Sequence, residues 1–107
     1  MVFFVKILTV NELVDALNSN ALKASNTYKG QYVELTGKLA TIDSSGKYFS
    51  LGRTDDELSF TTVLCNINKE HLAQVENFTD EQEVTVIGTI TSVGEILGYS
   101  LDVETIK

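Results

Sequence analysis

The sequence has little of the residue chemistry that catalysis and metal binding require. It contains one cysteine and one histidine in 107 residues, which excludes an intramolecular disulfide, a Cys-rich zinc site, a CxxC redox motif and a multi-histidine metal site. No GxSxG, GxGxxG or GK[ST] motif occurs, and no Ser/His/Asp spacing supports a catalytic triad. We therefore expect no catalytic residue, no metal and no cofactor, and a protein that is not an enzyme.

Basic residues are scarce as well. Eight Lys and Arg stand against fifteen Asp and Glu, for a formal net charge of −7. A chain this acidic repels phosphate backbones unless its few cations gather on one face. Nucleic acid is therefore a possible but disfavoured partner, and a protein or peptide is the favoured one.

The length and composition predict one folded domain over residues 1–107, with 43% apolar and 21% charged residues. Residues 1–8 are apolar apart from Lys6, lack a basic n-region and a cleavage site, and are too short to span a bilayer. We expect them to form an added strand or a hydrophobic staple. As it stands, the sequence predicts a soluble, cytoplasmic protein, or an exported or lipid-anchored one if a leader precedes it.

A helical segment is predicted over residues 9–26. Thr9 and Glu12 have the spacing of a capping box, so a helix should begin near Val10. Apolar residues then keep helical spacing. The polar run at 18–20 indicates a possible break into two short helices.

Residues 28–107 show the alternation of apolar and polar side chains that is typical of strands. The expected strands cover 31–39, 47–52, 59–67, 84–93 and 97–106, and an inserted helix covers 69–77. The order β-β-β-α-β-β is that of the OB-fold. The predicted fold is therefore all-β with minor α: a five-stranded Greek-key barrel preceded by an N-terminal helix.

A repeated glycine supports the barrel. Residues 33–39 and 84–90 both read V-x-(L/V)-x-G-x-(L/I), with Gly37 and Gly88 at the same phase. A glycine inside a strand lets it bend or bulge where a small barrel closes. We expect the first and fourth barrel strands to be neighbours. The alternative is that two Val-rich strands share a glycine by chance.

Several segments carry a family resemblance: residues 28–38, 63–65, 83–88 and 97–101. Through them the chain resembles the bacterial tRNA-anti-like OB-fold family over roughly residues 9–106. The resemblance implies an analogy to anticodon-binding OB domains, and many members are small lipoproteins or exported proteins. This chain shows no lipobox, is markedly acidic, and matches no catalytic motif of that family.

The OB-fold also indicates where a ligand would lie, because OB ligands usually cross the second and third strands. The candidate ligand-binding residues are the outward positions of these strands and the cations at their ends: Lys47, Tyr48, Ser50, Arg53, Phe60 and Thr62. Aromatic rings beside cations can stack bases and hold phosphates. The alternative is that Tyr48 and Phe60 form a cross-strand pair or lie buried under the helix.

Three other features have plainer interpretations. The acidic run at 55–57 lacks EF-hand spacing and is expected to be a solvated loop that repels phosphate. Cys65 lies in an apolar run and is expected to be a small buried side chain. His71, on a polar helix position, is expected at the surface.

Three functions follow from these observations. The leading hypothesis is an OB-fold module that binds a protein or peptide. The second is single-stranded nucleic-acid binding through the face of the second and third strands. The third is an acidic mimic that occupies a nucleic-acid site on another protein.

Overall fold

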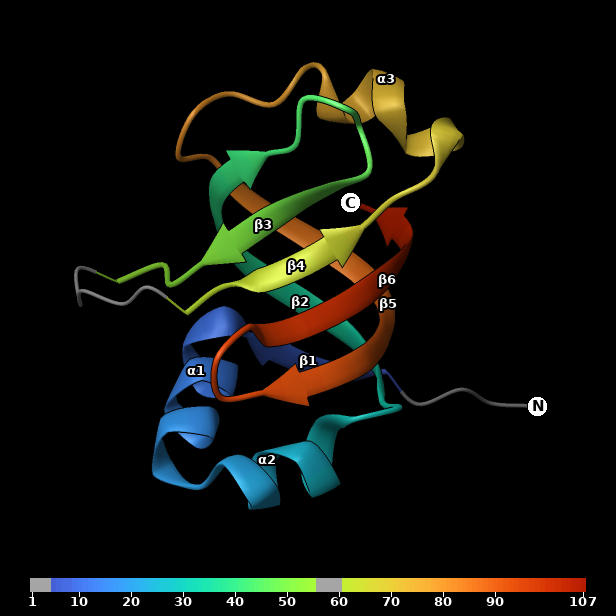
Figure 1. Cartoon of the computed structure of the whole chain (residues 1–107). Helices are drawn as coiled ribbons and strands as arrows, with labels where there is room; N and C mark the ends of the chain where they lie inside the picture. The colour runs from blue at the N-terminus through green and yellow to red at the C-terminus, as the bar shows by residue number, and fades with distance from the viewer. Residues whose placement is uncertain (1–4, 56–60) are drawn as a thin grey trace.

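The computed structural model describes residues 5–55 and 61–107 (Figure 1). Its elements in chain order are β1 (Lys6–Thr9), α1 (Val10–Ser19), α2 (Ala21–Tyr28), β2 (Tyr32–Ile42), β3 (Tyr48–Gly52), β4 (Val63–Asn66), the 3-10 turn η1 (Lys69–His71), α3 (Leu72–Val75), β5 (Glu83–Gly94) and β6 (Gly98–Ile106). Among these, no helix is long and apolar enough to cross a membrane.

The described strands form one sheet that closes on itself. The strand order is β1-β2-β3-β4-β6-β5, and β2 also pairs with β5. Five strands therefore make a barrel, in which β4 and β6 run parallel and the other neighbours antiparallel. This is the topology of the OB-fold. The predicted fold class is confirmed, as is the expected pairing of the first and fourth barrel strands.

The two repeated glycine motifs pair with each other in the β2–β5 ladder. Val33 is opposite Gly88, and Gly37 is opposite Val84. A Cβ atom at Gly37 would lie 2.5 Å from Val10 Cγ2 and 2.8 Å from Leu51 Cβ. One at Gly88 would overlap the carbonyl oxygen of the facing β6 strand. Both glycines are therefore required by close approach, which is why the motif recurs.

Helices α1 and α2 cover one end of the barrel, and α3 covers the other (Figure 1). Thr9 Oγ1 accepts the Glu12 amide at 3.2 Å, so the predicted cap is confirmed. Asn20 separates the two short helices, and its side-chain oxygen caps α2 by accepting the Lys23 amide at 3.0 Å. The expected added strand is β1, which pairs parallel with β2. Residues 1–4 of the apolar N-terminal stretch lie outside the described residues.

Tyr99 links α1 to the barrel. Its ring is fully buried, and its hydroxyl donates to the Leu13 carbonyl of α1 at 2.6 Å. Burial, with a smaller contribution from Tyr28, raises the pKa of Tyr99 to about 12. Tyr28 packs edge-on against the same ring at 6.2 Å between centroids. This buried hydrogen bond thus adds to the apolar packing that holds the helix on the barrel.

Two expectations for single residues had different outcomes. Cys65 is buried, as predicted, and burial raises the pKa of its thiol. The expectation that His71 lies at the surface is wrong, since only 6% of it is exposed. Its Nδ1 accepts the Asn68 amide at 3.3 Å, which leaves Nε2 to donate to the Glu104 carbonyl at 3.2 Å. The ring therefore caps a helical turn and joins it to β6.

Candidate binding faces

The first candidate face is the outer surface of β3, β4 and the adjacent part of β6, which we call the β3–β4 face. The register places Tyr48 beside Asn66, and Asn66 beside Asp102. Tyr48 is half-buried. Asn66 Nδ2 donates to Asp102 Oδ1 at 3.2 Å. The aromatic ring that sequence reasoning selected therefore lies on a row that ends in a carboxylate.

The other predicted residues of β3 and β4 are only partly available. Ser50 is only 5% exposed, so its side chain is covered and not accessible to a ligand. Its short side chain lies between Thr41 of β2 and Leu64 of β4, its neighbours in register. Thr62 is half-buried just before β4. Phe60 lies outside the described residues, as do positions 59 and 60 of the expected strand.

Arg53 is engaged in structural contacts. Its Nη1 donates to Asp15 Oδ1 at 2.7 Å, and its Nε and Nη2 donate to the two oxygens of Asp55 at 2.9 and 2.8 Å. These carboxylates raise the pKa of Arg53, and only 7% of its side chain is exposed. A charge held between two carboxylates attracts phosphate weakly, because their field cancels its own. Arg53 therefore joins α1 to the loop after β3.

Asn11, a second residue of α1, holds the same loop. Asn11 Oδ1 accepts the Thr54 amide at 2.9 Å, and Asn11 Nδ2 donates to Asp55 at 3.1 Å. Asn11 and Asp15 are one helical turn apart and so share a face of α1. The sequence placed both on the polar side of the helix, but the loop they hold is about forty positions away.

Lys47 is the remaining cation of the predicted set, and it is exposed. Its backbone amide donates to Asp43 Oδ2 at 3.2 Å. The pKa of Asp43 is lowered, first by a hydrogen bond from Ser45 and to a lesser extent by Lys47. The lysine thus has a carboxylate beside it at the start of β3. Of the predicted residues, Lys47 and its sequence neighbour Tyr48 remain accessible.

An apolar hairpin tip flanks this face and was missed by sequence reasoning. Ile96 and Leu97, between β5 and β6, are 89% and 88% exposed. The following Gly98 has φ of +77° and packs against the backbone of Thr62, at the start of β4. The signal was present as two aliphatic residues in a turn bounded by Gly94 and Gly98. The expected strand at 97–106 included Leu97, which obscured it.

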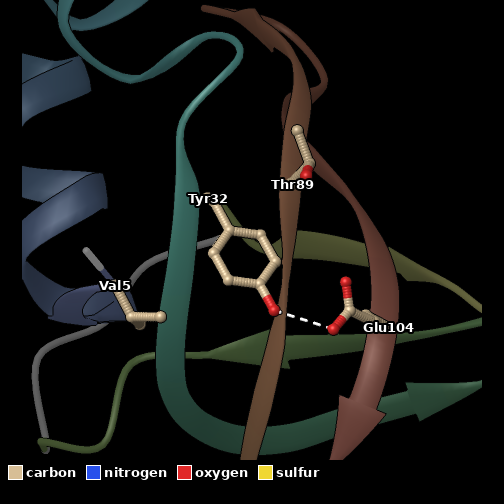
Figure 2. Close-up of a pocket in the computed structure, with 4 residues that line it drawn as sticks. All are labelled: Val5, Tyr32, Thr89 and Glu104. Atoms are coloured by element: carbon tan, nitrogen blue, oxygen red, sulfur yellow. Dashed lines mark hydrogen bonds between the residues drawn. The ribbon is translucent and has the colours of Figure 1, made fainter. Parts of the chain in front are cut away.

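A second candidate site is a hollow of about 530 Å³ on the opposite side of β6. It is lined by Val5, Tyr32, Thr89 and Glu104 (Figure 2). The Tyr32 hydroxyl donates to Glu104 Oε1 at 2.8 Å. That bond is the main reason why the pKa of Tyr32 is raised. Sequence reasoning missed this set, because its members come from segments that are distant along the chain.

Comparison with known proteins agrees with the fold. A lipoprotein of Klebsiella pneumoniae subsp. pneumoniae, described as a candidate nucleic acid-binding protein, is 18% identical, with a TM-score of 0.71 over 96% of this chain and 92% of its own. The Stn1–Ten1 complex of Schizosaccharomyces pombe contains a chain that is 13% identical, with a TM-score of 0.58 over 100% and 78%. An OBody bound to hen egg-white lysozyme is 16% identical, with a TM-score of 0.55 over 81% and 86%.

A search of curated proteins finds no match. The sequence matches the tRNA_anti-like family model over residues 4–98, which spans α1 and α2 and the barrel as far as the start of β6. The predicted family resemblance is therefore confirmed. This chain belongs to the tRNA_anti-like family of OB-fold proteins.

Proposed function

We propose that this protein is a non-enzymatic OB-fold module that binds a protein or peptide partner. The observation that carries the proposal is the exposed aliphatic pair Ile96 and Leu97, on the loop that flanks the β3–β4 face. In OB-folds the corresponding loop borders the ligand. Exposed aliphatic side chains at such a position favour contact with an apolar protein surface over contact with phosphates.

The charges on the face support the same conclusion. Arg53 is neutralised by Asp15 and Asp55, and the row from Tyr48 ends at Asp102. The whole chain carries a formal net charge of −7. Binding to a nucleic-acid backbone depends on cations that displace counterions. Few such cations lie on the face where OB-folds bind nucleic acid.

The polar pairs on the two faces also favour binding over catalysis. Arg53 with Asp15, Asn66 with Asp102, and Tyr32 with Glu104 are each joined by a hydrogen bond. None of these pairs contains a serine, cysteine or lysine nucleophile. Among the similar structures, the Stn1–Ten1 complex and the OBody with lysozyme are protein complexes.

Single-stranded nucleic acid is the second candidate. It is favoured by the half-exposed Tyr48 ring beside the exposed Lys47. A ring of this kind can stack one base, and an adjacent cation can hold its phosphate. The K. pneumoniae lipoprotein, described as a candidate nucleic acid-binding protein, gives this alternative its weight.

Site-specific photo-crosslinking in cells of the source organism tests the proposal. A benzophenone amino acid is placed at position 97, and as a matched control at position 22, because Leu22 is also an aliphatic residue with 73% exposure. We expect a discrete protein adduct from position 97 that is absent from position 22. Substituting Ile96→Ser should then weaken the binding of the identified partner. Adducts that are removed by nuclease, or equal adducts from both positions, would contradict the proposal.

A further inference from the structure

Two rows of outward side chains cross the sheet formed by β1, β2, β5 and β6. The register gives one row as Tyr32, Thr89 and Asp102, which Val5 borders in the hollow, and the other as Ile7, Glu34, Ile87 and Thr105. The alternate residues of these strands point into the core, as Val33 and Val86 do. This surface meets the β3–β4 face at Asp102, which pairs with Thr89 on one side and with Asn66 on the other. We call it the β2–β5 face.

A β-bulge shapes the hollow on the β2–β5 face. The pairing of β5 with β6 shifts between Ile87 and Gly88, so that Glu104 is an extra residue on the β6 side. Its side chain reaches toward the Tyr32 ring, and Thr89 and Val5 complete the lining (Figure 2). The hollow thus has an aromatic wall, an aliphatic wall and a carboxylate.

The carboxylate is only partly satisfied. Glu104 accepts one hydrogen bond from the neutral Tyr32 hydroxyl, and it has no ion-pair partner among residues 5–55 and 61–107. An ionised carboxylate has about four acceptor positions. Most of its capacity therefore remains open to a donor that enters the hollow.

The same face already holds a cationic side chain. Lys107 Nζ lies 2.7 Å from Glu34 Oε1, in the neighbouring row. The Lys107 backbone amide also donates to the Thr85 carbonyl of β5, at 2.9 Å. Lys107 thus shows that a cationic side chain can pair with a carboxylate of this face while its backbone bonds to a strand carbonyl. Ile7, 73% exposed beside Glu34, adds an apolar contact.

We propose that the hollow of the β2–β5 face binds an arginine side chain from a basic segment of a protein partner. The guanidinium stacks on the Tyr32 ring and donates to Glu104, while its aliphatic stem contacts Val5. Arginine fits better than lysine, because its planar group can stack and donate to a carboxylate at the same time. The inference rests on the proposed protein-binding function and names the chemistry of the partner.

An NMR titration of the whole chain tests this inference. The probe is a blocked Gly-Arg-Gly peptide, and the matched control peptide carries citrulline, which keeps the shape of arginine without its charge. We expect saturable shifts at Tyr32, Thr89 and Glu104 with the arginine peptide, and binding up to about fivefold weaker with citrulline, as for one exposed ion pair.

Two isosteric variants separate the hollow from the net charge. Glu104→Gln should weaken binding by about fivefold, because it removes the carboxylate and keeps its shape. Glu76→Gln removes the same charge from an exposed position on the other end of the barrel and should bind as the parent does. Glu104 and Glu76 are both exposed, so both variants are expected to fold.

Several results would overturn the inference. These are equal shifts with arginine and citrulline, equal losses in the two variants, shifts confined to the β3–β4 face, and no shift at a peptide concentration of about 10 mM. Shifts that change with protein concentration alone would assign the β2–β5 face to a second copy of the chain. The crosslinking from position 97 is independent of all of them, so the proposed function can stand if this inference fails.

Discussion

Replacing Gly88 by alanine should destabilise the barrel where β5 pairs with β6. The new Cβ would overlap the Asp102 carbonyl oxygen, and it would lie 2.8 Å from Leu101 Cδ2 and 3.0 Å from the Asp102 carbonyl carbon. Leu101 can change rotamer, but the Asp102 contacts are to backbone. Relief therefore requires the two strands to separate.

The magnitude follows from that geometry. Overpacking in a core typically costs about 1–3 kcal/mol, and a fixed backbone places Gly88→Ala at the upper end or beyond. Gly94→Ala is the matched control, because a Cβ there meets nothing within 4 Å. It should be neutral or stabilise the fold by up to about 1 kcal/mol, since alanine restricts the unfolded chain.

Urea unfolding followed by far-ultraviolet circular dichroism measures both variants. We expect Gly88→Ala to lower the free energy of unfolding by at least about 3 kcal/mol, or the melting temperature by at least about 12 °C. A Gly88→Ala protein within about 1 kcal/mol of the parent would refute the reasoning. So would equal losses for the two glycines.

Three further predictions concern buried and paired groups. The pKa of Tyr99 is about 12 in the fold and 10.0 when unperturbed, so the unfolded state loses its proton first. The free energy of unfolding should therefore fall by about 2–3 kcal/mol as pH rises from 10 to 12. Tyr99→Phe should flatten this fall in urea titrations. Replacing both Asp15 and Asp55 by asparagine should remove two carboxylates that hold Arg53 and raise oligonucleotide binding at low salt in fluorescence anisotropy, and a further Arg53→Gln should reverse the increase. Cys65 is buried with a raised thiol pKa, so its reaction with a thiol reagent should require unfolding and accelerate in urea; rapid labelling of the native protein would contradict its placement.

The fold could be predicted because its signals are local. The Thr9 cap, the alternation in the strands and the glycines at 37 and 88 each depend on residues a few positions apart. The glycine motif predicted a long-range contact only because it occurs twice, and the two copies pair with each other. The break at Asn20 followed from the low helix propensity of its neighbours.

The binding faces could not be predicted in the same way, because their contacts join distant segments. Arg53 looked like an available cation until Asp15, on another element, was placed beside it. His71 looked like a surface residue because its acceptor is the backbone of Glu104. The hollow depends on a bulge that moves Glu104 toward Tyr32, and a regular alternation of side chains does not show a bulge.

The central proposal is that this OB-fold binds a protein partner rather than single-stranded nucleic acid. The most direct measurement is an NMR titration of the whole chain at low salt with a mixed-sequence single strand of about 16 nucleotides, the upper range for one OB-fold. The account predicts no saturable shift at Tyr48, Thr62 or Asn66. Saturable, salt-sensitive shifts there, reduced by Tyr48→Ala, would contradict it.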